Sequence, residues 1–314
     1  HPEFGVYVPD VTLAVARNSV QSGLYSAILE ALYLDLHPDY KSWGCTSRDL
    51  ITQWYYVDAT ASGGGSGSEA APWTLAEAWA ANLQPGKGVR IKPGNYTQST
   101  AVTLQQSGTA QAPIWFVADD ITSMPVINGG GTGYVLTQQN AYIGIYGLEI
   151  TNMPGVGFGQ GADGIETHHI TVESCYFHDI EGEGGNNIAA LRMDKVSKSV
   201  FRNNLIVNIT SSNAQDDGHA WETYQGENNL FEHNEVINAK TGFYIKLPTA
   251  NLENGHIVRR NIFKDIRGAF FEIYGNSGEP QVHDKNIVAE NLSINAPFTD
   301  LSRELNIQPR NLYM

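Results

Sequence analysis

Apolar residues recur at fixed places around four regularly spaced asparagines in the second half of the chain. Asn204, Asn234, Asn261 and Asn291 follow one another at intervals of 30, 27 and 30 residues. An apolar residue stands three places before each: Phe201, Phe231, Val258 and Val288. The residue two places after is apolar in all but the last, where Ser293 breaks the pattern. A period above about 20 residues indicates stacked supersecondary units. Short β-rich segments separated by Asn and Gly make those units coils of a β-solenoid.

A second short strand precedes each asparagine segment. We align these strands as ADGIETH, IAALRMD, GHAWETY, GFYIKLP and GAFFEIY. Because side chains alternate along a strand, the alignment predicts two inward stacks. The first holds Ile165, Leu191, Trp221, Ile245 and Phe271, and the second Thr167, Met193, Thr223, Leu247 and Ile273. The asparagines themselves would form a buried ladder, with amides bonded from coil to coil.

The same alignment predicts an outward column of charged residues between the two inward stacks. Its members are Glu166, Arg192, Glu222, Lys246 and Glu272. Opposite charges on neighbouring coils attract, so the column could serve only to fix the register of the coils. The alternative is a substrate groove, with Tyr224, Tyr244 and Tyr274 beside it as platforms for sugar rings. Those tyrosines could equally be aromatic packing on the outside of the sheet.

The first part of the chain does not share the repeat. Apolar residues from Val20 to Leu32 follow helical spacing, and the helix should stop near His37-Pro38, because a proline disfavours helix in the residue before it. We therefore expect three parts. Residues 1–52 form a helical cap or a docking segment, residues 53–300 form the solenoid, and residues 301–314 form a tail.

The entry to the repeat resembles a known group of proteins. Its pieces are a strand at Tyr55–Asp58, a loop at Gly63–Gly67, the helical segment APWTLAEAW, and PGKGVRIKPGNY. In this order they resemble the entry segment of right-handed parallel β-helix proteins, which include pectate-lyase-like enzymes, other bacterial polysaccharide lyases and phage tailspikes. The resemblance covers roughly residues 54–300. It implies an all-β, right-handed parallel β-helix with a short N-terminal helical segment, and an active site on the exposed parallel sheet.

Composition narrows the classes of partner. Among 314 residues, 17% are charged and the net charge is −14. Duplex nucleic acid is therefore excluded as an expected partner, since phosphate binding needs a basic face. No run is apolar enough to span a membrane and no signal peptide is visible. Cys175 falls in the asparagine column, which predicts a buried free thiol, although a disulfide to Cys45 stays open.

The acidic segment before Glu222 suggests a cation site. Asp216 and Asp217 lead directly into the strand GHAWETY. With Glu222 they could supply the hard oxygen ligands that Ca²⁺ prefers, or they could form a solvated turn. The segment DDGH also resembles the DD and GHG motifs of polygalacturonase-like glycosidases, although in those enzymes the two motifs lie on separate coils.

Two reaction types fit these residues. A polysaccharide lyase needs a base for the proton beside a uronic carboxylate, and a cation to neutralise that carboxylate. Lys246 or Arg192 could be the base, as in the lyases that the chain resembles, with Ca²⁺ or the other cation on the carboxylate. Flanking carboxylates at Glu222 and Glu272 would raise the pKa of Lys246 and make it a poorer base unless Ca²⁺ engaged Glu222.

An inverting glycosidase needs two carboxyl groups at about 6.5–9.5 Å. Asp194 and Glu222 lie one coil and two residues apart, which gives roughly 8 Å at sheet spacings. The leading hypothesis is a carbohydrate-active protein, secreted or on a virion surface, that binds and cleaves a polysaccharide, with lyase chemistry favoured. The alternative is a non-catalytic virion protein, such as a trimeric tail spike, fibre or capsid-decorating protein.

Overall fold

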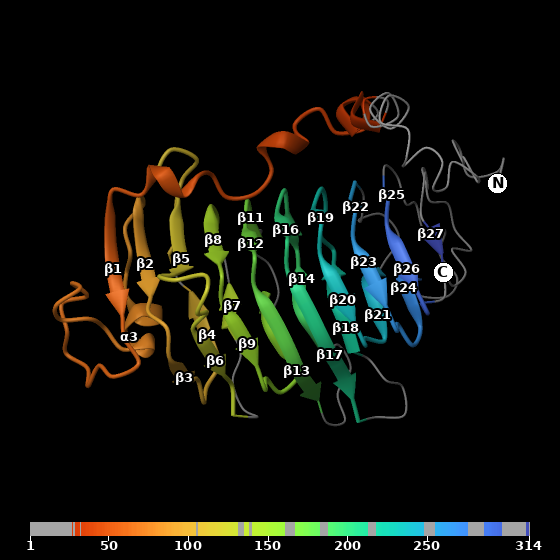
Figure 1. The fold of residues 1–314 in the computed structure, drawn as a ribbon. Helices are drawn as coiled ribbons and strands as arrows, with labels where there is room; N and C mark the ends of the chain where they lie inside the picture. The colour runs from red at the N-terminus through yellow and green to blue at the C-terminus, as the bar shows by residue number, and fades with distance from the viewer. Residues whose placement is uncertain are drawn as a thin grey trace.

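A computed structural model shows a parallel β-solenoid, in which each strand pairs with its counterpart one coil away (Figure 1). The structure describes residues 27, 29–31, 33–104, 106–130, 135–137, 140–160, 167–182, 188–212, 218–247, 255–275, 286–296 and 312–313. Three sheets run along the axis, and the chain passes through them in the same order in successive coils. The all-β solenoid with a short N-terminal helix that the sequence predicts is confirmed.

The sheets are named here in the order in which a coil visits them. Sheet 1 contains β1 (Gln53–Val57), β2 (Lys87–Ile91), β5 (Ile114–Ala118), β8 (Ile143–Tyr146), β12 (Thr171–Glu173), β16 (Val200–Arg202), β19 (Leu230–Glu232), β22 (Ile257–Arg259) and β25 (Ile287–Ala289). Sheet 2 contains β3 (Asn95–Thr97), β6 (Val126–Asn128), β9 (Glu149–Thr151), β13 (Tyr176–Gly182), β17 (Leu205–Ser211), β20 (Glu235–Ile237), β23 (Ile262–Lys264), β26 (Leu292–Ile294) and β27 (Leu312–Tyr313).

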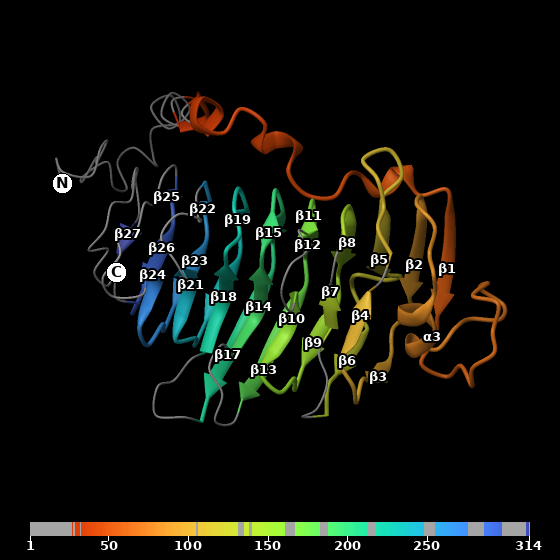
Figure 2. The ribbon, with the colours of Figure 1, turned by 180° about the vertical axis from the view of Figure 1, so that it is seen from behind.

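Sheet 3 carries the candidate site and faces away in Figure 1, so it is best followed in Figure 2. It contains β4 (Val102–Leu104), β7 (Val135–Thr137), β10 (Val156–Gln160), β14 (Ile188–Asp194), β18 (Gly218–Tyr224), β21 (Thr241–Leu247) and β24 (Ala269–Gly275). A two-stranded ladder of β11 (Thr167–His168) and β15 (Val196–Ser197) lies between sheet 3 and the next strand of sheet 1.

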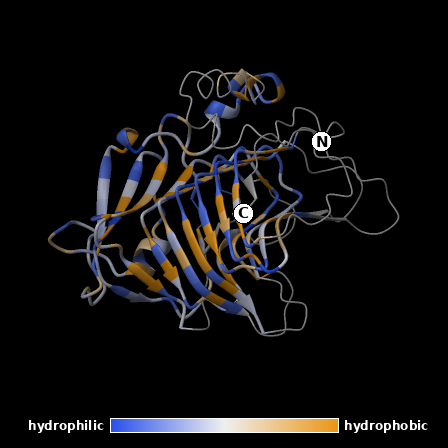
Figure 3. Ribbon diagram, turned by 45° about the vertical axis from the view of Figure 1, so that its right-hand side comes forward, coloured by the Kyte–Doolittle hydropathy of each residue, from blue (hydrophilic) through white to orange (hydrophobic). Residues whose placement is uncertain are grey.

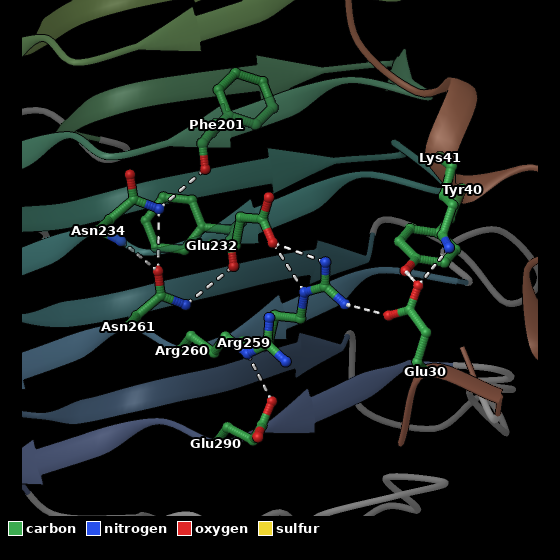
Figure 4. Close-up of polar contacts among 11 residues, drawn as sticks. Glu30, Tyr40, Lys41, Phe201, Glu232, Asn234, Arg259, Arg260, Asn261 and Glu290 are labelled. Carbon is green, nitrogen blue, oxygen red and sulfur yellow. Dashed lines mark hydrogen bonds and ion pairs between the residues drawn. The ribbon is translucent and has the colours of Figure 1, made fainter. Parts of the chain in front are cut away.

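The predicted asparagine ladder is confirmed between sheets 1 and 2. The Nδ2 groups of Asn204, Asn234 and Asn261 each donate to Oδ1 of the next asparagine at 3.0 Å. Each Oδ1 also accepts from a backbone N–H one coil earlier, and the first of these bonds joins Cys175 N to Asn204 Oδ1 at 2.9 Å. Figure 4 shows the step from Asn234 to Asn261. All four asparagines are buried, so their amides form hydrogen bonds with one another and with the backbone instead of with water.

Cys175 occupies the ladder column as a buried free thiol, as predicted, and Cys45 is free as well. Aromatic and aliphatic side chains fill the interior beside the ladder. The largest that are fully buried include Trp221, Phe201, Phe231, Phe243 and Phe271. Hydrophobic and hydrophilic residues alternate along the strands in Figure 3, as expected when one face of each strand is buried.

Helix α3 (Leu75–Ala80) lies at the first coils, where Trp79 packs against Phe116 with ring centroids 4.9 Å apart. Its start is fixed by a capping box. Thr74 Oγ1 accepts from the backbone N–H of Glu77, and the Glu77 carboxylate accepts from the backbone N–H of Thr74. At the other end, β27 adds to β26, so part of the predicted tail covers an edge that would otherwise be open.

A strap from the N-terminal part runs along the outside of sheet 1 (Figure 1). We define the N-terminal strap as residues 29–31 and 33–50; its helix ends at Leu36, before His37, as predicted. Its core contacts are Leu29, Tyr33, Tyr40 and Trp43 against Val200, Leu230, Ile257, Ile287 and Ala289. The described part of the segment therefore lies along the side of the solenoid. The division at residue 52 stays a prediction, because residues 1–26 lie outside the described part.

Charged residues fasten the strap to sheet 1 (Figure 4). Arg259 on β22 donates from Nη2 to Glu232 at 2.8 Å, and its Nη1 lies 3.8 Å from Glu30 of the strap. Glu30 also accepts from Lys41 at 2.7 Å and from the Tyr40 hydroxyl. Gly44 permits the close approach, since a Cβ there would stand 2.6 Å from Thr171 Oγ1.

We expect acid to loosen the strap before it affects the asparagine ladder. Burial alone would raise the pKa of Glu30, but hydrogen bonds from Lys41 and Tyr40 bring it below its usual value. The hydrogen bond from Lys198 lowers the pKa of Asp39. Both carboxylates therefore stabilise the folded strap above their unfolded pKa values, and that stability is lost as the pH falls through the folded ones. The ladder amides do not titrate.

Hydrogen exchange measures this difference, after correction for intrinsic rates. The backbone N–H groups of Gly44 and Cys45, which bond to Lys198 and Thr171, should lose protection between about pH 6 and about pH 3. The ladder N–H groups should keep theirs. Lys198→Gln is the matched control, because it removes the hydrogen bond that lowers the pKa of Asp39 and so should weaken the pH dependence. Equal protection of Gly44 at both pH values would contradict the expectation.

Candidate functional site

Two features decide which residues lie on the outer face of sheet 3. One is the register of the strands, and the other is a pair of successive inward residues on each of three strands. Ala220 and Trp221 are neighbours on β18, and both belong to the buried core. The same holds for Ala190 and Leu191 on β14, and for the pair Phe270 and Phe271 on β24. After each inward pair the strands resume alternation, so the next residue points outward.

Two columns of residues follow on the outer face. The first contains Gly159, Arg192, Glu222, Tyr244 and Glu272. The second contains Asp194, Tyr224, Lys246 and Tyr274. The prediction that these residues lie on the outward positions of one sheet is supported by this register, but their expected order is wrong in two places.

Lys246 is not in the column of Arg192 and Glu222. The alignment matched Gly242 with Gly218, whereas the register pairs His219 with Thr241 and Glu222 with Tyr244. The strand is therefore displaced by two residues, which also moves Ile245 from the Trp221 stack to the Thr223 stack. A displacement of two keeps each side chain on its face but shifts it about 7 Å along the strand.

This correction changes the surroundings of Lys246. Its neighbours in register are Tyr224 and Tyr274, not Glu222 and Glu272. The alternating column of acids and bases does not exist, so it cannot be a device that fixes the register. The two flanking carboxylates that argued against Lys246 as a base are also absent from its column.

Glu166 is also misplaced in the alignment. The strand that pairs with β14 on its N-terminal side is β10, and Gly159 stands opposite Arg192. The next described strand of that coil, β11, pairs with β15 and not with sheet 3. Glu166 itself lies outside the described residues, as do Asp216 and Asp217. The column position assigned to Glu166 is held by Gly159, where a Cβ would stand 2.9 Å from Arg192 O and from Val156 Cγ1.

Arg192 and Asp194 form an ion pair on β14. The Nη2 of Arg192 lies 3.0 Å from Oδ2 of Asp194, two residues along the same face. Glu222 follows Arg192 in register, and its side chain is 0% exposed although it points away from the core. Asp194 and Glu222 are diagonal neighbours, as the sequence predicts.

His219 belongs to the segment DDGH that the sequence pointed to, but the sequence assigned it no role in the site. Its ring stacks on Tyr244 with centroids 4.2 Å apart and planes 4° from parallel, and both side chains are buried. In the next coil, Thr241 Oγ1 donates to Glu272 Oε2 at 3.1 Å. His219 and Thr241 share a third outward column, on the far side of the inward pairs. The GH that follows the two aspartates was the available signal, but only the register shows what the histidine contacts.

The family of the chain follows from its sequence and agrees with this fold. The family model described as "Pel9A-like, right handed beta helix region" matches residues 55–262. The chain belongs to this Pel9A-like β-helix family. The resemblance recognised at the entry segment is therefore confirmed, and with it the right-handed β-helix. Among curated protein sequences, none matches the chain significantly.

Two solved structures are similar to this Pel9A-like chain over most of the chain's length. One is a "Rhamnogalacturonan lyase", with a TM-score of 0.59, 14% identity, and coverage of 78% of this chain and 69% of that one. The other is "pectate lyase Pel9A", with a TM-score of 0.52, 13% identity, and coverage of 84% of this chain and 77% of that one. At such identities the likeness establishes the fold.

The calcium site that the sequence predicts includes residues outside the described part. Within the described ranges, no group of three His, Cys, Asp or Glu side chains is placed to hold a metal ion. Of the predicted calcium ligands only Glu222 is described, and β18 begins at Gly218, directly after Asp217. The hard oxygen donors of this set suit Ca²⁺, so the calcium site stays a prediction.

Chemically, the outer face of sheet 3 combines a cation, carboxylates and aromatic rings on rigid strands. Arg192, oriented by Asp194, can bind a carboxylate. Lys246 lies in the neighbouring column, next to Tyr224 and two strands from Arg192 in the order β14-β18-β21. No helix among the described residues is long and apolar enough to cross a membrane.

Proposed function

We propose that this Pel9A-like protein is a polysaccharide lyase that cleaves a uronic-acid polymer by β-elimination on the outer face of sheet 3. The observation that supports it most is the register of Lys246, which lies between two tyrosines and beside the column of Arg192. Membership of the family and the fold shared with two lyases add support. Because its substrate would be a polymer, we propose that it acts outside cells, secreted or on a virion surface.

In the proposed reaction, a uronic carboxylate binds to Arg192, which Asp194 holds in place. The neutral amine of Lys246 takes the proton from the carbon next to that carboxylate. The released electron pair forms a C=C bond, the glycosidic C–O bond breaks, and the departing oxygen takes a proton from water. The Lys246 ammonium then returns its proton to water, which restores the neutral amine. Ca²⁺ held by Asp216, Asp217 and Glu222 would neutralise further charge on the substrate carboxylate. Tyr224, Tyr274 and Glu272 would line the sugar subsites, and Tyr244, which is buried against His219, would support them from below.

A panel of acidic polysaccharides tests the proposal. Cleavage should produce unsaturated chain ends, seen by ultraviolet absorbance, and chelation of Ca²⁺ should reduce it. Lys246→Ala should lower kcat about 100-fold or more, the range expected when a general base is removed. Lys264→Ala removes an exposed lysine from sheet 2 and should leave kcat unchanged.

Three other outcomes would contradict the proposal, and two of them would point to a different function. Full activity of Lys246→Ala would refute this mechanism. New reducing ends without unsaturated ends would indicate hydrolysis by Asp194 and Glu222. If no polysaccharide were cleaved and the native mass were trimeric, the result would favour a non-catalytic virion protein.

A further inference from the structure

A second candidate binding surface lies on the outer side of sheet 1, at the first coils. Trp54, Gly88, Trp115 and Gly144 stand opposite one another on four consecutive strands. The tryptophans lie flat on the glycines. A Cβ on Gly88 would stand 2.4 Å from the Trp54 ring, and one on Gly144 would stand 2.2 Å from the Trp115 ring. The alternation therefore builds a flat aromatic surface that no other residue type in the glycine column would permit.

The end of the N-terminal strap crosses this surface and forms a cavity with it. The cavity has a volume of about 440 Å³ and is lined by Arg48 and Asp49 of η3 (Arg48–Leu50) and by Trp54 and Arg90 of sheet 1. Aliphatic wall is supplied by Ile51 and Val117. Small-molecule sites commonly have volumes of about 300–1,000 Å³ and combine apolar walls with a few convergent polar groups.

Two guanidinium groups and one carboxylate, that of Asp49, line the cavity, so its lining has one net positive charge in a chain of net charge −14. Arg48 lies 3.7 Å from the centroid of Tyr146 and 5.5 Å from that of Trp115. Within the described ranges, no carboxylate lies within ion-pair distance of Arg48. Arg90 lies 4.9 Å from the centroid of Trp54, and its Nη1 is 3.2 Å from Asp119. Tyr146 and Trp115 thus hold Arg48 by its flat face and leave its N–H edge for an anion.

We propose that this cavity binds a carboxylated sugar residue of an acidic polysaccharide, separately from the outer face of sheet 3. A planar guanidinium binds a carboxylate through two parallel hydrogen bonds, and an indole ring offers an apolar surface to sugar C–H groups. The class of ligand rests on the proposed function. The site itself rests on the cavity, the two arginines and Trp54.

The location of the cavity suggests a role in retaining long chains. It lies on β2, whereas Lys246 lies on β21, five coils further along the axis in the order β2-β5-β8-β12-β16-β19. At about 4.8 Å per coil this is roughly 24 Å, on a different sheet. A polymer can contact both sites at once, and a short oligosaccharide cannot.

Binding of polygalacturonate by isothermal titration calorimetry tests the inference. We expect the Arg48→Gln/Arg90→Gln double variant to bind at least about 10-fold more weakly than the unsubstituted protein. Lys264→Gln, which loses one positive charge on sheet 2, should bind normally. Fully methyl-esterified polygalacturonate, which lacks the carboxylates, should bind weakly to all three. Equal affinity of the double variant and the unsubstituted protein would overturn the inference.

Two further measurements keep this result separate from that of the proposed function. Arg48→Gln alone leaves the Arg90–Asp119 pair intact, so it reports on the cavity if the double variant folds poorly. The same titrations in a Lys246→Ala background exclude turnover. Weakened binding without cleavage by the unsubstituted protein would support the cavity and refute the lyase. Cleavage with unchanged binding in both arginine variants would support the lyase and refute the cavity.

Discussion

Replacing Asn234 with alanine should destabilise the solenoid by about 3 kcal/mol or more, because several buried groups lose their partners at once. Asn234 Oδ1 accepts from the backbone N–H and the Nδ2 of Asn204, and its Nδ2 donates to Phe201 O and to Asn261 Oδ1. Asn204 Nδ2 keeps its bond to Val172 O, but the Asn204 N–H has no substitute. An unsatisfied buried N–H costs roughly 1–3 kcal/mol, and the cavity left by the amide adds to this.

Urea unfolding followed by circular dichroism measures the loss. Asn208→Gly is the matched control. Asn208 belongs to a second, more exposed asparagine pair, in which Asn238 Nδ2 donates to its Oδ1 at 2.9 Å. Its φ of 56° suits glycine, so the substitution should cost about 1 kcal/mol or less. A loss at Asn234 no larger than that at Asn208 would show that the buried ladder does not stabilise the fold.

Replacing Arg259 with alanine should cost about 3–5 kcal/mol, because it leaves a buried carboxylate without its partner. The Arg259 side chain is 8% exposed and the Glu232 side chain 10%. Burial alone would lower the pKa of Arg259, but the Glu232 carboxylate beside it raises that pKa, so the guanidinium stays charged. Arg259 also lies over the rings of Tyr33 and Tyr40, so its loss removes strap contacts as well. Figure 4 shows Arg259 beside Glu232 and Glu30.

Two comparisons isolate the buried charge in thermal unfolding. The double variant Arg259→Met/Glu232→Leu should recover much of the loss, because no unpaired charge remains. The neighbouring Arg260 pairs with Glu290 at 2.8 Å but is 34% exposed, so Arg260→Met should cost about 1 kcal/mol or less. If Arg259→Ala and Arg260→Met were equally mild, the pairing of Arg259 and Glu232 would not be an anchor of the strap.

The asparagine ladder was predictable because it depends on sequence period alone. Identical residues at nearly equal intervals stack in a solenoid, and a buried stack of amides has a single way to satisfy its hydrogen bonds. Cys175 could be assigned to the same column for this reason. The strap contacts had no such signal, since Glu30 and Arg259 are far apart in the sequence and no repeat relates them.

The sequence could predict which residues point outward from sheet 3, but it could not predict which of them share a column. Glycines at the starts of GHAWETY and GFYIKLP invited a match between Gly218 and Gly242, whereas Gly242 occupies an inward place against Phe263. Period-two alternation cannot detect an error of two residues, since every side chain stays on the correct face. Only the observed pairing of the strands could therefore show that Lys246 lies in the column of Tyr224 and Tyr274 and not in that of Glu222.

The bonds from one side-chain amide to the next in the asparagine ladder all point the same way along the axis. The Nδ2 groups of Asn204, Asn234 and Asn261 each donate one hydrogen to the Oδ1 of the next coil, and their other hydrogen goes to a backbone carbonyl of the previous coil. Neighbouring amides therefore polarise one another in the same sense, which strengthens bonds inside a chain more than bonds at its ends. One amide turned over would place oxygen against oxygen on one side and NH₂ against NH₂ on the other. The orientation of any single amide is thus a property of the whole row, and the coils gain a common direction that their backbone repeat alone does not give them.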